Sequence, residues 1–344
     1  MDRIDTGDAP EMVAPPAYAP FPVTSDPTPW SLTRMVVPTA VGDVVVHVRL
    51  GDRPLLLLHG VAGSWTTWTP LLRAADGFDG RGLVLVDLPG WGSSPAPAVP
   101  LSTDDAVRVL GEVLDALGMD AVDVVGHSMG AFVAMHCAVT MPERVRSVVL
   151  VSGTTFATAH AARHPLFGLV TLPAFTLLRA GLAVTRGAAV PLLRTLAAVG
   201  LLQLLAAPVF THVGRLDRSV LDAFVEELRP EGFLAAARSG AAYDTDRWRG
   251  ITVPVTAVAG QDDVFARVTD LARLVGVLPR VRTVLLEDCG HFAHVEHPEA
   301  VAEALLAADA CAADDRGAGG TGVLSRTAVA SRTQPVVGAP RRSS

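Results

Sequence analysis

The sequence predicts an α/β fold built on a doubly wound, mostly parallel sheet with an inserted helical cap. Three observations indicate this fold. Short apolar runs alternate with helix-type patterns along most of the chain, a Gly-His-Ser-Met-Gly stretch at 126–130 joins one apolar run to a helix-favouring run, and the alternation stops between residues 156 and 248. Strands that alternate with helices are typical of a parallel sheet covered on both faces.

Seven apolar runs predict buried strands, because they are short, rich in Val and Leu, and bounded by turn residues. The runs are residues 43–48, 55–58, 83–86, 122–125, 145–151, 253–259 and 281–286. In such sheets, ligands bind outside the carboxyl ends of the strands. The residues that directly follow these runs are therefore the first candidates for a functional site.

Helix-type patterns lie between the apolar runs. In residues 103–117, acidic side chains occupy the first turn, apolar side chains share one face, and Gly118 ends the pattern. A second helix, after the Gly-His-Ser-Met-Gly stretch, is expected to stop before Pro142. A third begins near Pro298, which the first turn of a helix tolerates.

The Gly-His-Ser-Met-Gly stretch has the form of a sharp strand-to-helix turn that exposes a serine hydroxyl. Gly126 and Gly130 flank Ser128, since a Cβ at either position would clash or resist the strained dihedrals. A serine hydroxyl is a weak nucleophile until a base takes its proton and a carboxylate orients that base. We therefore expect Ser128 to act as a nucleophile and its two partners to follow later strands.

The expected chain order of the partners is a carboxylate and then a histidine. Asp262 and Asp263 follow the run that ends at residue 259, and His291 follows the run that ends at residue 286. Both positions lie at the predicted carboxyl edge of the sheet. At this point, either aspartate can supply the carboxylate.

Four segments now carry a resemblance to a known family. They are Leu-Leu-Leu-Leu-His-Gly at 55–60, Asp-Leu-Pro-Gly-Trp-Gly-Ser-Ser at 87–94, the turn at 126–130, and the G-H-x4-E-x-P spacing at 290–298. In these segments, the chain resembles the cap-bearing, cofactor-free serine hydrolases of the α/β-hydrolase fold, over about residues 35–310. The resemblance implies Ser128 as nucleophile, His291 as base and Asp263 as acid, because the G-x-x-D pattern of the family starts here at Gly260. Asp262 is the alternative acid.

An oxyanion hole needs two backbone N–H donors near the developing negative charge. Met129 follows the serine at the start of its helix, where unpaired N–H groups and the helix dipole favour an anion. Val61 follows the His59-Gly60 turn. We expect the N–H groups of Val61 and Met129 to form the hole.

Three further side chains are candidates for the substrate pocket. His59 either lines the pocket or braces its loop as a structural histidine, and the bracing role is favoured on geometric grounds. Trp65 and Trp91 follow the loop at His59-Gly60 and the loop that begins at Asp87. They either wall the pocket or pack in the core.

Composition excludes several classes of function. The chain has 344 residues, is 50% hydrophobic and 18% charged, and carries a net charge of −7 without a basic stripe, which argues against nucleic-acid binding. Cys137, Cys289 and Cys311 are too few for a disulfide framework or a metal site, and they favour a cytoplasmic protein with reduced thiols. We expect no metal and no organic cofactor. The sequence does not fix an oligomeric state.

The chain divides into a core with three additions. We expect a Pro-rich N-terminal extension at 1–34 without a secretory signal, a hydrolase core at 35–155 and 249–310, a helical cap at 156–248, and a disordered tail at 311–344. Residues 195–213 lack charge, which raises a membrane span as an alternative, but the polar and proline interruptions favour a buried or pocket-lining helix pair. A weak membrane-surface contact of the cap stays open.

The predicted function is hydrolysis of a carboxylic ester or a related acyl compound, a small and lipophilic molecule, through an acyl-Ser128 intermediate. A lipophilic substrate is expected because the cap offers few charges to hold a polar one. Carbon-carbon bond hydrolysis of a diketone-like substrate, thioester cleavage and perhydrolysis use the same three residues. The alternative from another class is a noncatalytic ligand-binding or membrane-associated protein on a hydrolase scaffold.

Overall fold

A single mixed sheet forms the centre of the molecule. The computed structural model describes residues 10–14 and 17–317, and the strands in this part run in the order β1-β9-β8-β7-β6-β4-β5-β3-β2. Neighbouring strands are parallel from β1 to β5, whereas β3 is antiparallel to both β5 and β2. The predicted fold class, a doubly wound and mostly parallel sheet, is confirmed.

Each of the seven predicted strands is present, with ends that differ by three residues or fewer. The strands are β1 (Glu11–Val13), β2 (Thr33–Thr39), β3 (Gly42–Arg49), β4 (Asp52–Leu58), β5 (Arg81–Val86), β6 (Val122–His127), β7 (Val145–Val151), β8 (Val255–Gly260) and β9 (Val281–Leu286). The sequence analysis missed β1 and β2, the two edge strands. Most side chains of both are exposed or half-buried, so neither shows the apolar run of a central strand.

Two groups of helices cover the two faces of the sheet. Residues of α2 (Thr103–Ala116), α3 (Met129–Thr140) and α11 (Val268–Val277) share one apolar cluster with alternate strand residues such as Leu56. Residues of α1 (Thr69–Ala74) and α13 (Pro298–Gly317) share the other cluster, with strand residues such as Leu57. Adjacent strand residues therefore point to opposite cores, as both faces of a buried sheet require.

The predicted helix boundaries have clear local causes. Ser102 caps α2 in a capping box with Asp105, and Gly118 takes a φ of +65° just beyond its end. The α3 helix ends at Thr140, two residues before Pro142, and Pro298 begins α13.

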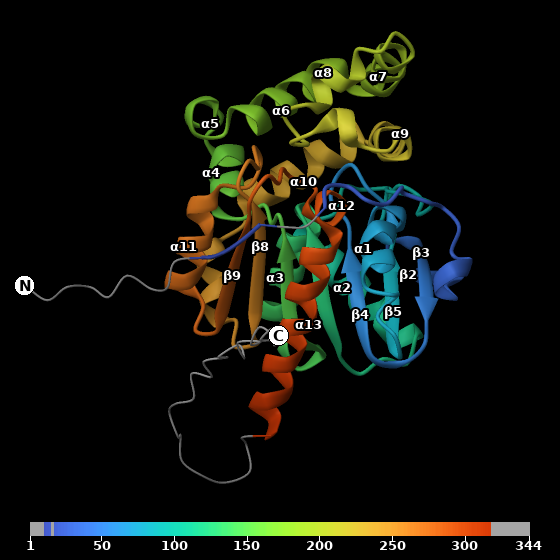
Figure 1. Ribbon diagram of the computed structural model, residues 1–344, viewed down its shortest axis with the longest axis vertical. Coiled ribbons are helices and arrows are strands. Elements are labelled where there is room, and N and C mark those ends of the chain that lie inside the picture. Colours follow the sequence, from blue (N-terminus) through green and yellow to red (C-terminus); the bar gives the residue numbers. More distant parts are fainter. Residues whose placement is uncertain (1–9, 15–16, 318–344) are drawn as a thin grey trace, which may run out of the picture.

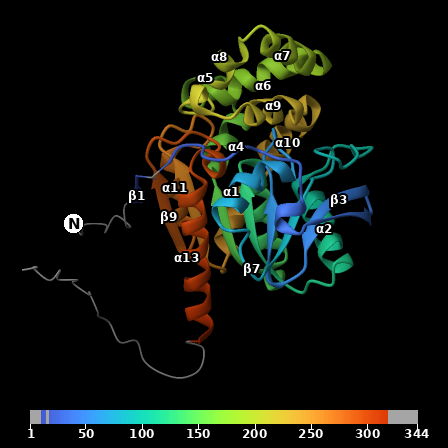
Figure 2. The ribbon, with the colours of Figure 1, turned by 45° about the vertical axis from the view of Figure 1, so that its right-hand side comes forward.

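Seven helices between β7 and β8 form the cap, which lies over the carboxyl ends of the strands (Figures 1 and 2). They are α4 (Phe156–Arg163), α5 (Pro165–Thr171), α6 (Pro173–Thr185), α7 (Ala189–Ala198), α8 (Leu202–Ala206), α9 (Arg218–Glu226) and α10 (Pro230–Ala242). A 3-10 helix at Thr245–Gly250 returns the chain to β8.

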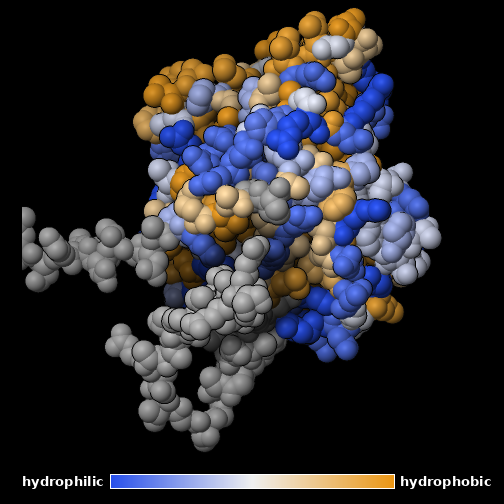
Figure 3. Space-filling model, in the orientation of Figure 1, coloured by the Kyte–Doolittle hydropathy of each residue, from blue (hydrophilic) through white to orange (hydrophobic). Residues whose placement is uncertain are grey.

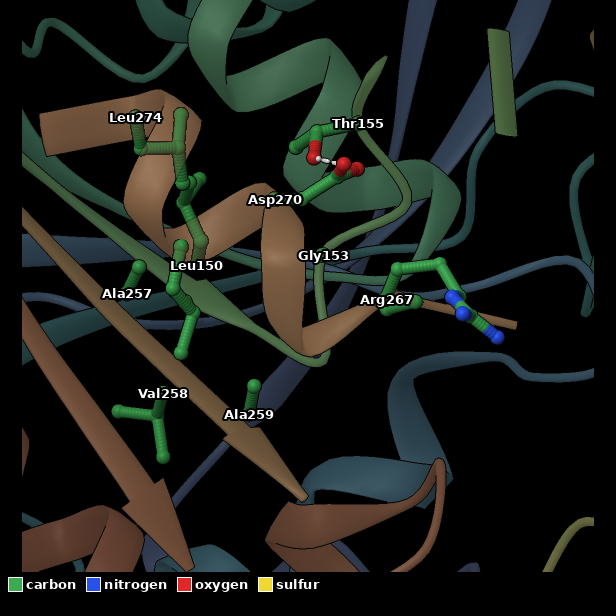
Figure 4. Close-up of a pocket in the computed structure, with 11 residues that line it drawn as sticks. Leu150, Gly153, Thr155, Ala257, Val258, Ala259, Arg267, Asp270 and Leu274 are labelled. Carbon is green, nitrogen blue, oxygen red and sulfur yellow. Dashed lines mark hydrogen bonds between the residues drawn. The ribbon is translucent and has the colours of Figure 1, made fainter. Parts of the chain in front are cut away.

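A buried carboxylate ties the first cap helix to the core. Asp270 of α11 accepts hydrogen bonds from Thr155 Oγ1 at 2.7 Å and from the Ala157 N–H at 2.9 Å. Figure 4 shows the Thr155 and Asp270 side chains pointing toward each other beside a small pocket between α11 and the sheet. Burial raises the pKa of Asp270, and the two hydrogen bonds oppose that rise. The start of the cap is therefore fixed to α11, which packs against the sheet.

In the described residues, the N-terminal extension is joined to the core, and the C-terminal end differs from expectation. Within the N-terminal extension, β1 pairs with β9 and a 3-10 helix spans Thr28–Trp30, so this segment is attached to the core. At the other end, α13 continues to Gly317, although 311–317 were expected in the disordered tail. Eight of the sixteen residues 298–313 are alanine, which has the highest helix propensity, and this favours continuation of the helix past residue 310. The expectation for 318–344 lies outside the described residues.

The uncharged run at 195–213 is only partly buried. Leu202, Ala206 and Phe210 are buried, but Leu201 and Leu204 are 45% and 71% exposed. The expectation of a buried or pocket-lining helix pair is therefore wrong for Leu201 and Leu204, which are exposed and do not line the cavity. The short α8 helix packs one side inward and leaves its other side on the molecular surface.

Candidate active site

Ser128 sits on the predicted sharp turn between β6 and α3. Its backbone φ is 52° and its ψ is −114°, a conformation that non-glycine residues rarely adopt. A Cβ added to Gly126 would clash with the Gly130 carbonyl, and one added to Gly130 would clash with the Leu58 carbonyl. The turn therefore needs glycine on both sides of the serine, and the strain is held by close backbone packing.

Three predicted side chains meet at the carboxyl edge of the sheet. The distance from His291 Nε2 to Ser128 Oγ is 2.9 Å, and His291 Nδ1 lies 2.9 and 2.8 Å from the two carboxylate oxygens of Asp263. Because a carboxylate only accepts, Nδ1 carries the hydrogen and Nε2 is left to accept the serine proton. All three residues are buried.

Asp263, not Asp262, makes this contact. Asp263 Oδ1 also accepts hydrogen bonds from the Phe265 and Ala266 N–H groups, at 2.8 and 2.9 Å, which fix the carboxylate toward His291. Asp262 is exposed. The structure therefore places Asp263, the aspartate that the family resemblance favoured, beside His291.

The two expected oxyanion donors lie on either side of Ser128. Met129 is the first residue of α3, so its N–H has no partner within the helix. A Cβ added to Gly60 would lie 3.0 Å from Ser128 Cβ, which shows how closely the turn before Val61 passes the serine. Val61, Ser128 and Met129 line the same cavity.

Of the three expected pocket residues, Trp91 lines the cavity, whereas His59 and Trp65 do not. His59 is fully buried, with Nε2 accepting from the Leu88 N–H at 3.1 Å and Nδ1 donating to the Gly60 carbonyl at 2.7 Å. It braces the loop, the favoured alternative. Trp65 stacks on His47 with ring centroids 4.1 Å apart, so the pocket expectation is wrong there because the ring packs in the core.

The cavity above Ser128 is large and mostly apolar. Its volume is about 1100 Å³, and it lies between the cap helices α6, α7 and α10 and the loops that follow β4 and β5. Among its lining residues, which all lie in the described part of the chain, the charged side chains apart from histidine are Arg229 and Glu231. Arg229 is already paired with Glu227 Oε2 at 3.3 Å. The cavity can enclose a ligand of drug size or larger with few charged groups.

A buried glutamate, which the sequence analysis did not single out, holds the loop that carries His291. Glu296 accepts hydrogen bonds at 3.0 Å from the N–H groups of Gly290, Phe292 and Thr211 and from the Tyr18 hydroxyl. Gly290 and Phe292 are the two neighbours of His291. Burial raises the pKa of Glu296, and the hydrogen bonds oppose that rise. The position of Glu296 in the G-H-x4-E-x-P pattern could have indicated its importance from the sequence. The pattern does not reveal which groups the carboxylate binds.

We expect Glu296→Gln to lower kcat about tenfold with little change in KM, because an amide cannot accept all four hydrogen bonds and His291 would lose its fixed position. The free energy of unfolding should also fall, by about 2 kcal/mol. Steady-state kinetics and urea denaturation of the same samples check both effects. Tyr18→Phe is the control, because it removes one of the four bonds and leaves those beside His291. An unchanged kcat in a destabilised Glu296→Gln protein would show a purely structural role.

Three more buried histidines surround this loop, and all have depressed pKa values. Burial lowers the pKa of His59 to about 4 and that of His294 to about 3, with the charge of His291 adding to the effect on His294. Burial also lowers the pKa of His127, whose Nε2 donates to the His291 carbonyl at 2.9 Å. Within residues 10–14 and 17–317, neither ring nitrogen of His294 has a hydrogen-bond partner. Protonation of these three rings is less favourable in the folded protein than in the unfolded chain, so it lowers the free energy of unfolding.

We expect the protein to lose stability as the pH falls below about 6.5, where unfolded histidines take up protons and these folded histidines do not. His294→Leu removes one such group without removing a hydrogen bond. Between pH 6 and pH 5, the free energy of unfolding of this variant should fall less steeply than that of the wild type. The two slopes should differ by about 1 kcal/mol per pH unit. Urea denaturation at each pH measures this slope. Exposed His164 provides the control His164→Leu, and equal slopes in both variants would contradict the assignment.

Residues 55–304 match the sequence profile described as the alpha/beta hydrolase family. The chain is 32% identical over 261 residues, which is 72% of this chain and 84% of the relative, to a 2-hydroxy-6-oxononadienedioate/2-hydroxy-6-oxononatrienedioate hydrolase of Burkholderia vietnamiensis. A protein of the same name from Paraburkholderia phymatum is 32% identical and covers 74% of this chain, with 86% of its own length matched.

Solved structures show the same architecture. An esterase from Exiguobacterium antarcticum superimposes with a TM-score of 0.65 over 80% of this chain and 98% of its own, at 16% identity. At this identity, the likeness concerns the fold alone.

Proposed function

Since the chain belongs to the alpha/beta hydrolase family, we propose that it cleaves a bond to a carbonyl carbon through covalent attack by Ser128. The observation that carries this proposal is the hydrogen-bonded chain from Asp263 through His291 to Ser128, buried at the foot of a large cavity. A serine so placed has the base and the orienting carboxylate that nucleophilic catalysis needs.

In the first half of the reaction, Ser128 Oγ attacks the carbonyl carbon while its proton moves to His291 Nε2. The carbonyl oxygen becomes an oxyanion, which the Val61 and Met129 N–H groups stabilise by hydrogen bonds. Asp263 holds the ring and stabilises the imidazolium that forms. As the tetrahedral intermediate collapses, the bond to the leaving group breaks, and that group takes the proton from His291.

The second half repeats these steps with water. His291 takes a proton from the water molecule, whose oxygen attacks the acyl carbon, and the ester bond to Ser128 then breaks. Ser128 Oγ regains its proton from His291, and the carboxylic acid leaves. No step requires a redox change or a group beyond the substrate and water.

The cavity supports a substrate with a large apolar part. Its walls are mostly aliphatic and aromatic, and Arg229 is the one basic side chain besides histidine among the described lining residues. An apolar acyl group gains up to about 0.8 kcal/mol of binding free energy for each methylene that it buries. A carboxylate on the substrate would find a single partner in Arg229, which must also serve Glu227.

The relatives favour the carbon-carbon alternative over the ester that the sequence analysis placed first. Their names describe hydrolases of hydroxy-oxo-dienedioates. For a ketone substrate, the breaking bond leaves its electron pair on carbon, so the leaving fragment needs a conjugated carbonyl to accept the pair before His291 supplies a proton. We therefore place cleavage of such a conjugated ketone first and cleavage of an apolar ester second.

A substrate panel with one shared acyl group distinguishes the two bonds. The panel contains a conjugated hydroxy-oxo-dienoate, an oxygen ester, a thioester and a lactone, each with the same apolar acyl part. We expect the highest kcat/KM for the dienoate, followed as loss of its conjugated absorption band, and no effect of added chelator on any rate. A clear preference for the oxygen ester would return the ester to first place. If a folded enzyme whose Ser128 reacts with a fluorophosphonate turned over no member of the panel, an apolar acyl substrate would be contradicted.

The cavity should also set a chain-length optimum. In a series of conjugated hydroxy-oxo-dienoates or esters that differ only in the length of a linear acyl group, kcat/KM should rise about fourfold per methylene and then level off when the cavity is full. Leu182→Trp, at a buried lining position, should move the optimum to shorter chains. Leu50→Trp, at an exposed position remote from the cavity, is the matched control. A preference for acetyl compounds throughout would contradict the apolar-substrate proposal and leave the roles of the three residues intact.

A further inference from the structure

The outer surface of the cap exposes an unusual concentration of large apolar side chains. In the described residues, eleven of the seventeen exposed large hydrophobic side chains lie between residues 166 and 205, on α5 to α8 and their connections. Figure 3 shows hydrophobic residues gathered along the top of the molecule over these helices. We call this surface the cap face. Its members are Leu166, Phe167, Leu169, Val170, Leu177, Val184, Leu192, Val199, Leu201, Leu204 and Leu205.

The side chains of the cap face are too exposed to belong to the edge of the hydrophobic core. Leu166, Val170 and Val184 are 83%, 81% and 84% exposed. Single exposed apolar side chains are ordinary on soluble proteins, but eleven of them gathered on four successive helices (Figure 3) mark an interaction surface.

The charge of this part of the chain identifies the kind of partner. The protein as a whole carries a net charge of −7, but residues 156–216 contain no Asp or Glu and five Arg. Arg194 is exposed on α7, and Arg186 is exposed in the 3-10 turn between α6 and α7. The helices α5 to α8 thus combine exposed leucine and valine with arginine and no acid, which makes them complementary to an anionic lipid surface, whereas acidic side chains begin at Asp217 and continue on α9.

The large cavity reaches this surface. Leu177, Leu192 and Leu205 belong to the cap face, with 61%, 49% and 51% of their surface exposed, and the same three side chains line the cavity. The cavity above Ser128 and the cap face are therefore continuous through leucine side chains.

We propose that the cap face docks on the surface of an anionic membrane, with α5 to α8 lying in the plane of the interface. The continuous helical stretch Pro173–Ala198 is long and apolar enough to cross a membrane, with 17% of its most apolar window buried. A spanning orientation is disfavoured because Phe175, Leu182 and Ala189 pack in one cluster with Phe233 of α10. Arginines within the stretch would also be costly at the centre of a bilayer.

Docking in this position would place the leucine-lined opening against the acyl chains of the membrane. An apolar substrate dissolved in the membrane could then enter the cavity without crossing water, a consequence that rests on the proposed function. The docking itself does not rest on it, because it depends on the outer side chains and their charge. Binding and catalysis are therefore tested separately.

Vesicle flotation of the full chain tests the docking. We expect it to float with vesicles of phosphatidylglycerol and phosphatidylcholine and to bind pure phosphatidylcholine at least tenfold more weakly. Val170→Glu/Val184→Glu should lower the partition coefficient about tenfold or more, since neither side chain lines the cavity and both would have to enter the interface. Arg186→Glu/Arg194→Glu should lower it by about fivefold or more per arginine.

Matched controls separate docking from other causes. Val36→Glu/Leu50→Glu adds the same two charges at exposed apolar positions on the edge strand β2 and after β3, outside the cap helices, and it should float like the wild type. Ser128→Ala should also float like the wild type, whatever its activity. Absence of flotation with anionic vesicles at low salt, or equal flotation of both Glu pairs, would overturn the proposal. A dimer in sedimentation analysis that Val170→Glu/Val184→Glu dissociates would assign the cap face to a second copy and overturn it too.

Discussion

Replacing Ser128 with alanine is expected to lower kcat by about 10⁵-fold or more, and His291→Ala by a similar factor, because the two act as one unit. In each variant, one end of the 2.9 Å contact between Ser128 Oγ and His291 Nε2 is lost. Combining the two substitutions should cost little more than either one alone. Steady-state kinetics on the best substrate of the panel measures all three variants.

Ser152→Ala is the matched control for Ser128→Ala. Ser152 is another buried serine, with a φ of 46°, and follows β7 at the same edge of the sheet, but it does not line the cavity. We expect its kcat to stay within a few-fold of the wild type. If Ser128→Ala kept near-normal turnover of the true substrate while folded, covalent attack by this serine would be wrong.

Replacing Asp263 with asparagine is expected to lower kcat by about 10⁴-fold, although the two side chains have nearly the same shape. The amide can donate a hydrogen bond to His291 Nδ1, which would place the hydrogen on Nε2 and remove the acceptor that Ser128 needs. It would also lose a carboxylate that accepts from the Phe265 and Ala266 N–H groups.

Asp262→Asn is the matched control, since the same change is made one residue away on an exposed side chain. We expect less than a fewfold change in kcat. The reverse ranking of the two variants would transfer the orienting role to Asp262. Thermal unfolding of both proteins distinguishes loss of chemistry from loss of fold.

The central sheet and the three meeting side chains could be predicted because local sequence determines them. Strands that are buried on both faces are apolar at nearly every position, so they appear in the sequence as uninterrupted Val and Leu runs. The strained turn at Ser128 needs glycine at 126 and 130. Residues that directly follow parallel strands must also meet at one edge, so Asp263 and His291 could be placed near Ser128 before their distances were known.

Other features depend on contacts between distant parts of the chain, which local sequence does not show. Glu296 acts through Tyr18 and Thr211, which are 278 and 85 residues away along the chain. Trp65 could wall the pocket or pack in the core, and its contact with His47 decided for the core. The edge strand β1 consists of three residues and is recognisable only by its pairing with β9.

The cap illustrates why composition alone gave a mixed result. The uncharged run at 195–213 was compatible with burial, a pocket or a membrane, and the structure divides it among more than one of these environments. Val209 lines the cavity and is buried, whereas Leu204 is exposed on the cap face. A short helix with apolar side chains all round can bury only one side against the core.

The most direct test of the account is covalent labelling of the intact protein by a fluorophosphonate, which reacts with serines activated by a histidine base. The account predicts one adduct per chain, located by mass spectrometry on Ser128, formed at a rate that falls sharply in His291→Ala and is unchanged in Ser152→Ala. Parallel loss of hydrolytic activity should accompany the adduct. A folded protein that hydrolyses its substrate while Ser128 stays unlabelled, or one that labels at another residue, would contradict it.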